Sequence, residues 1–83
     1  MGDKVRYEVE IEEKGEEKTI KIEVEKGTKG LFFQEDVYRV YLVKSGIFFD
    51  EREELGEIKD LSQLKSFLET ALGVKVKRLK TLS

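Results

Sequence analysis

The feature that most constrains the fold is a strict alternation of apolar and charged residues near the N-terminus. Between Val5 and Ile11, apolar side chains occupy the odd positions and charged side chains the even ones. The alternation returns over residues 20–24. A period of two is typical of a β-strand with one buried face and one face in water. The sequence therefore predicts two strands in this part of the chain.

The residues between these two strands indicate how the strands pair. Lys14-Gly15 is suited to a two-residue hairpin turn, because glycine readily adopts the positive φ that such turns require. This turn sets a register in which Lys4, Arg6 and Glu8 face Glu25, Glu23 and Lys21, respectively. Opposite charges then meet on one face and apolar residues meet on the other. We predict an antiparallel hairpin in this register.

The middle of the chain predicts further strands. Residues 37–43 are almost all β-branched or aromatic, and both faces of the segment are apolar, which indicates a central strand. Residues 26–36 contain Gly27 and Gly30, lack clear periodicity and predict a loop or an irregular edge segment. Ser45-Gly46 predicts a tight turn, after which residues 47–49 return as a short strand. Another short strand is expected around residues 55–58.

Residues 61–72 predict an amphipathic helix. Asp60 is a good N-cap, Gln63 completes an approximate capping box and Gly73 suits a left-handed C-cap. At about 100° per residue, the large apolar residues gather on one face of the helix. They are Leu61, Leu64, Phe67, Leu68, Ala71 and Leu72. A helix with one apolar face needs one sheet to pack against.

Together these segments predict one α+β domain over residues 1–83. It is an antiparallel β-meander of about five strands packed on a single C-terminal helix, and the alternation at Val74 and Val76 predicts a final short strand. A chain of 83 residues is too short for a second independent core. We identify no internal repeat and no linker.

Two aromatic pairs, Phe32-Phe33 and Phe48-Phe49, leave more apolar surface than one short helix can cover. In an extended chain only one residue of each pair can face the core. Either the sheet curls into a partial barrel that encloses the surplus, or the far face of the sheet docks onto a second copy of the chain. We therefore treat Phe32, Phe33 and Phe48 as candidate binding residues.

The residue types that are missing exclude several kinds of chemistry. The chain has no cysteine and no histidine, which removes disulfides, thiol catalysis, thiolate metal sites and the usual general base. The acidic stretch 50–60 does not match a calcium loop, because Leu55 and Ser62 would occupy ligand positions. We expect no enzymatic activity, no cofactor and no metal site.

A basic C-terminal segment and a Gly-x-x-Gly loop raise the possibility of phosphate contacts. The candidate residues are Lys26, Lys29, Lys75, Lys77 and Arg78. With exposed aromatic residues nearby, this pattern is found in proteins that bind single-stranded nucleic acid. The structural alternative is that a basic strand pairs beside the acidic N-terminal hairpin. We favour this alternative, because dedicated nucleic-acid binders usually carry net positive charge and this chain carries −2.

Composition bounds the remaining expectations. Charged residues make up 41% of the chain and proline is absent, a profile found in hyperthermophile proteins and in designed proteins. No apolar stretch reaches the ~18 residues of a membrane span, and we expect a cytoplasmic protein without a membrane partner. The sequence favours a non-enzymatic structural or protein-interaction module, and it leaves open whether the partner is another protein or a second copy in a homodimer. A nucleic-acid-binding domain and a designed protein without biological activity are the alternatives.

Overall fold

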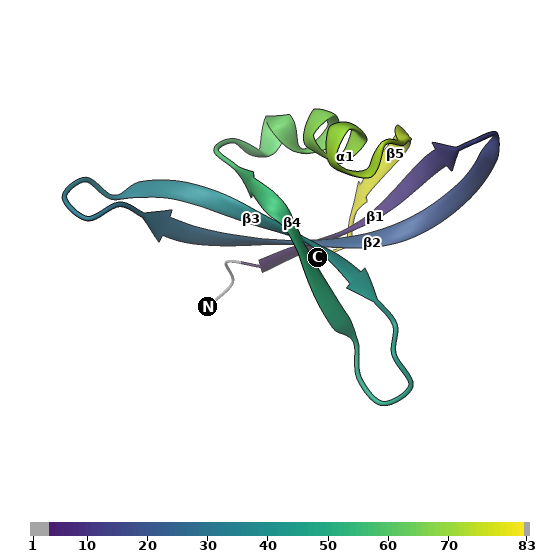
Figure 1. Cartoon of the computed structure of the whole chain (residues 1–83), viewed down its shortest axis with the longest axis horizontal. Helices are drawn as coiled ribbons and strands as arrows, with labels where there is room; N and C mark the ends of the chain where they lie inside the picture. Colours follow the sequence, from purple (N-terminus) through teal and green to yellow (C-terminus); the bar gives the residue numbers. More distant parts are fainter. Residues whose placement is uncertain (1–3, 83) are drawn as a thin grey trace.

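The computed structural model describes residues 4–82 and, within them, five strands and one C-terminal helical segment. The elements are β1 (Lys4–Glu13), β2 (Glu16–Lys29), β3 (Glu35–Lys44), β4 (Glu51–Ile58), a 3₁₀ turn η1 (Leu61–Gln63), α1 (Leu64–Leu72) and β5 (Lys75–Thr81). The strands form an antiparallel sheet in the order β4-β3-β2-β1-β5 (Figure 1). The predicted α+β class and meander packed on one C-terminal helix are confirmed.

The N-terminal hairpin pairs in the predicted register. Lys14 and Gly15 both have positive φ, 52° and 82°, as a type I′ turn requires. Glu8 lies opposite Lys21, Arg6 opposite Glu23 and Lys4 opposite Glu25. The turn residues and the alternation were therefore sufficient to fix the alignment of β1 on β2.

Strands β2, β3 and β4 are longer than the sequence suggested. The backbone ladder between β2 and β3 continues to the pair Lys29 and Glu35, so residues 26–29 and 35–36 belong to strands and the loop is confined to residues 30–34. An ion pair between Lys26 and Asp36 spans this extension at 3.6 Å. Residues 47–49 are a loop tip and not a strand, because pairing of β3 with β4 begins only at Lys44 and Glu51.

The sheet is open, and its edge strands are β4 and β5. The partial barrel is therefore wrong. Helix α1 lies over one face of the strongly twisted sheet (Figure 1). The helix itself covers the apolar side chains beneath it. The sheet therefore does not need to curl into a barrel to bury them.

The helical segment has the predicted N-cap and C-cap, and it differs from the prediction in three details. The Asp60 carboxylate accepts from Ser62 N at 3.1 Å, and Gly73 ends α1 with a φ of 65°. The Gln63 side chain accepts a hydrogen bond from Lys59 N at 3.2 Å, one residue before the N-cap. The first turn is a 3₁₀ turn and the α-helix begins only at Leu64. Ala71, placed on the apolar face by the periodicity, is exposed.

The core lies between α1 and the facing side of the sheet. Its most deeply buried side chains are Ile22, Leu68, Val9, Val24 and Val40. Gly56 lets the helix approach β4 closely, since a Cβ there would lie 2.8 Å from the Phe67 ring and its φ is 152°. The ring of Phe67 thus packs directly on the backbone of β4, beside a bulge in the β3–β4 pairing.

The face of the sheet opposite α1, called the outer face here, is covered by charged side chains. The Arg52 guanidinium lies 4.4 Å from the centre of the Tyr41 ring on β3. The same group lies 3.4 Å from Glu23 and 3.3 Å from Glu25, and Glu23 is a buried acid. Arg52 therefore covers the Tyr41 ring, one of the apolar side chains on the far face of β3.

Candidate docking tips

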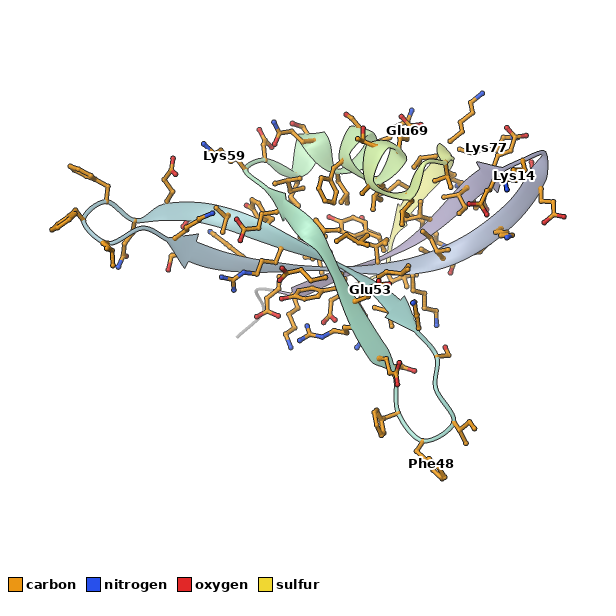
Figure 2. The ribbon with its side chains drawn as sticks, viewed as in Figure 1. Lys14, Phe48, Glu53, Lys59, Glu69 and Lys77 are labelled. Atoms are coloured by element: carbon orange, nitrogen blue, oxygen red, sulfur yellow. The ribbon has the colours of Figure 1, made fainter. Side chains whose placement is uncertain are left out.

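Two hairpin loops carry large apolar side chains into solvent. The first aromatic tip is Leu31, Phe32 and Phe33 in the β2–β3 loop, and the second aromatic tip is Ile47, Phe48 and Phe49 in the β3–β4 loop. Each of these six side chains is between 72% and 95% exposed. Figure 2 shows Phe48 at the far end of its loop, pointing away from the sheet. These are the exposed large hydrophobic residues that most need an explanation.

Neither phenylalanine of each pair faces the core. The expectation that one of the two could do so applies to extended chain, in which successive side chains point to opposite faces. At Phe32-Phe33 and Phe48-Phe49 the chain reverses direction beyond the last strand pairs, so neither face of the sheet extends beneath them. Both members of each pair consequently remain in water.

The two aromatic tips share one local structure. Their sequences match as Gly30-Leu31-Phe32-Phe33-Gln34-Glu35 and Gly46-Ile47-Phe48-Phe49-Asp50-Glu51. In each loop the glycine lies against the carbonyl oxygen three residues later, that of Phe33 or Phe49, where an added Cβ would overlap it. A side chain at either glycine would therefore force the turn open. This match is a short internal repeat, contrary to the expectation that the chain has none, and the signal for it is the shared Gly-x-Phe-Phe-x-Glu pattern.

Charges flank both aromatic tips in the same order. A lysine precedes each tip, Lys29 or Lys44, and an acidic residue follows it, Glu35 or Glu51. Lys29 lies 3.3 Å from Glu57, and Lys44 lies 3.0 Å from Glu53. Such exposed ion pairs stabilise by about 0 to 1 kcal/mol each and can be exchanged for others. Apolar patches rimmed by charge in this way are typical of interaction surfaces.

The basic C-terminal residues lie within the sheet, beside the acidic hairpin. On β5, Lys75 faces Glu12 and Arg78 faces Glu10 of β1. Lys77 Nζ lies 2.9 Å from a Glu17 oxygen and 3.9 Å from a Glu12 oxygen. Its hydrogen bond with Glu17 raises the pKa of Lys77 and lowers the pKa of Glu17. The basic strand thus pairs beside the acidic N-terminal hairpin, as the structural alternative to phosphate binding predicted.

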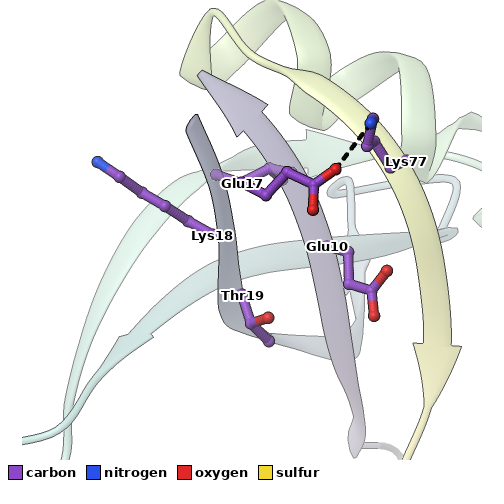
Figure 3. A pocket seen from close by; sticks show the side chains of 6 residues that line it. Glu10, Glu17, Lys18, Thr19 and Lys77 are labelled. Carbon is purple, nitrogen blue, oxygen red and sulfur yellow. Dashed lines mark hydrogen bonds and ion pairs between the residues drawn. The ribbon is translucent and has the colours of Figure 1, made fainter. Parts of the chain in front are cut away.

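A hollow of about 300 Å³ lies beside this ion pair (Figure 3). Figure 3 shows the Lys77 ammonium group joined to Glu17 across its mouth, with Glu10, Lys18 and Thr19 around it. The lysines and glutamates of its lining balance in number, so the hollow has no surplus charge with which to attract an ionic ligand.

Lys26 and Lys29 are not brought together with the basic strand. They lie at the C-terminal end of β2, whereas Lys77 contacts Glu17 at the opposite end of the same strand. Lys26 pairs with Asp36, and Lys29 with Glu57. The five candidate phosphate-binding residues therefore form two separate groups, and Lys26, Lys29 and Lys77 are each paired with acidic neighbours.

Across residues 4–82 no three carboxylates lie close enough together to hold a metal ion. No helix in the same range is long and apolar enough to cross a membrane. Comparisons with models of protein families, with curated proteins and with solved structures each found no match for the chain. The site must therefore be interpreted from its own residues.

Proposed function

We propose that the chain is a non-enzymatic protein-interaction module that docks through its two aromatic tips. The observation that carries this proposal is the exposure of six large apolar side chains, 72% to 95% each, on two matched hairpin loops. Phenylalanine is enriched at the centres of protein interfaces and depleted from ordinary exposed loops.

The energetics support a docking role. Burying a large apolar side chain stabilises by roughly 1.5 to 3 kcal/mol, a gain that the fold does not receive from side chains left in water. Charged neighbours such as Lys44 and Glu51 supply the polar rim of an interface. A partner that covers both tips would therefore gain most of its binding energy from Phe32, Phe33, Phe48 and Phe49.

Photocrosslinking tests this proposal. A benzophenone amino acid placed at Phe48 in the full chain, produced in cells and irradiated, should yield covalent adducts with protein. A matched variant with the same group at Lys14, on the polar tip of the β1–β2 hairpin, should yield few. Equal yields from the two positions, or adducts with lipid alone, would contradict the proposal.

A further inference from the structure

We infer that the partner is a second copy of the chain, bound reciprocally: the first aromatic tip of each copy packs on the second aromatic tip of the other. This inference rests on the proposed function, because it names the occupant of the same two tips. It is carried by the placement of the tips at the two ends of β3 and by the apolar area that the tips offer.

The two tips lie at opposite ends of one strand. The β2–β3 loop leads into β3 at Glu35 and the β3–β4 loop leaves it at Lys44. Ten residues of strand separate the loops by about 30 Å. Figure 1 shows the two hairpins reaching out from the sheet in different directions, away from α1. Consider a two-fold axis perpendicular to β3 at the middle of the strand. It would place the start of β3 in one copy beside the end of β3 in the other. The first aromatic tip of each copy would then meet the second aromatic tip of the other.

The charges at the two ends of β3 are already paired within each chain. At the start of the strand, Glu35 lies 3.9 Å from Lys59 and Asp36 lies 3.6 Å from Lys26. At its end, Lys44 lies 3.0 Å from Glu53. Neither end has a surplus of charge to offer the other, so the placement and the area of the tips set the orientation of the two copies.

The apolar area fits a dimer that uses both tips. Phenylalanines bury roughly 150 to 200 Å² each, so four of them with Leu31 and Ile47 offer on the order of 1,000 Å² per copy. A standard interface buries about 800 Å² per partner. One tip pair alone supplies about half of that amount, which is typical of weak contacts. Reciprocal pairing is the arrangement that uses the full area.

Two hollows on the described part of the chain do not suit the tips. They have volumes of about 300 and 280 Å³ and are lined mostly by charged residues. A phenylalanine placed in either would bury charges without a partner. Packing of one tip on another is therefore the mode of self-association that the surface supports.

Sedimentation equilibrium with two complementary variants tests the inference. Phe32→Ser/Phe33→Ser removes the first aromatic tip, and Phe48→Ser/Phe49→Ser removes the second. The unaltered chain should form a dimer, and each variant alone should stay monomeric. An equal mixture of the two should recover a heterodimer through its one remaining tip pair, at least about a hundredfold weaker than the unaltered dimer, a difference of roughly 2.7 kcal/mol.

Matched controls keep the outcomes separate. Lys14→Ser, on the polar tip of the first hairpin, should leave the dimer unchanged, and circular dichroism should show both tip variants folded. Self-association of each variant without association in the mixture would mean that like tips pair with like, and would overturn the reciprocal arrangement.

Three further outcomes separate this inference from the proposed function. If the unaltered chain is monomeric at millimolar concentration and its Phe48 crosslinks to a different protein, the second copy is wrong and the interaction module stands. Binding to phosphatidylcholine vesicles, lost in both tip variants and without a protein adduct, would overturn both. Absence of any adduct in a monomeric chain would overturn both as well.

Discussion

The chain places the same residue types in two opposite environments. Leu68, on α1, is fully buried against the sheet, whereas Leu31, in the first aromatic tip, is 95% exposed. Leu68 is buried because the helical period carries it to the face that meets the strands. Leu31 sits where the chain reverses, beyond the last β2–β3 pair, and no element covers it. Position in the fold and not residue type decides burial, so the apolar residues of the tips remain available to a partner.

The β1–β2 hairpin shows that a turn in this sheet does not need apolar residues. Its tip is Lys14-Gly15, flanked by Glu13 and Glu16, and it closes a ten-pair ladder. Polar residues at such a tip leave the hairpin soluble and well registered. A polar turn therefore suffices for a hairpin of this sheet, and at the other two hairpins the close approach of the chain is made possible by Gly30 and Gly46.

The largest effect should separate the core from the tips directly. Leu68→Ala removes a fully buried side chain and should lower the free energy of unfolding by about 2 to 5 kcal/mol. Leu31→Ala, the same substitution in the first aromatic tip, should change it by less than about 0.5 kcal/mol at concentrations where the chain is monomeric. Urea unfolding monitored by circular dichroism measures both. A loss above about 2 kcal/mol for Leu31→Ala would mean that the tip belongs to the core.

A second pair of variants tests the close packing of the core. Gly56→Ala forces a Cβ to within 2.8 Å of the Phe67 ring at a φ of 152°, and should cost about 1 to 3 kcal/mol. Gly27→Ala is the matched control, since its new Cβ would meet only the Arg39 guanidinium at 3.5 Å. Thermal unfolding should show a lowered midpoint for the first variant and a small change for the second. Equal midpoints would contradict the close approach of α1 to β4.

Most of the fold followed from local pattern. The alternation and the Lys14-Gly15 turn fixed the first hairpin, and Asp60 and Gly73 fixed the ends of the helical segment, because turns and caps depend on a few neighbouring residues. The first and last residues of β2, β3 and β4 could not be predicted from the local pattern. Strand length there depends on cross-strand pairs such as Lys26 with Asp36, which join residues distant in the sequence.

The candidate site was only half predicted. Phe32, Phe33 and Phe48 were identified as binding residues because the core could not hold them all, but residues 47–49 were assigned to a strand. The alternation argument fails at a loop tip, where neither face is covered. The coverage of Tyr41 was also missed, because a lone Arg52 on the neighbouring strand gives no periodic signal.

The outer face of the sheet is neither as buried as the core nor as exposed as the aromatic tips. A substitution at Arg52 tests how much this face contributes to stability. Arg52→Ala should lower the free energy of unfolding, by less than Gly56→Ala, because it uncovers Tyr41 and leaves the buried Glu23 without its cation. Lys44→Ala removes an exposed pair with Glu53 and should leave stability nearly unchanged. Urea unfolding compares the two. Equal changes in the free energy of unfolding would mean that the contacts of Arg52 with Tyr41 and Glu23 do not stabilise the fold.

The smallest effect is a pH dependence that reports burial in the core. Burial, with a lesser contribution from Tyr38, raises the pKa of Tyr7 above its ordinary value of 10.0. The folded state therefore favours the neutral phenol, so this contribution is fully present below about pH 10 and is lost as the pH rises through the raised pKa. Unfolding curves at about pH 9 and about pH 11 should diverge less for Tyr7→Phe than for the unaltered chain. An identical decline in both would assign the pH dependence to other groups.

The account depends on the aromatic tips being free of the fold in the single chain. The most direct test is the relaxation of phenylalanine ring protons by a soluble paramagnetic agent, measured by NMR at a concentration where the chain is monomeric. We predict strong relaxation for Phe32, Phe33, Phe48 and Phe49, near that of free phenylalanine, and clear protection of Phe67 under α1. Protection of the four tip residues equal to that of Phe67 would contradict the claim that these loops are docking elements.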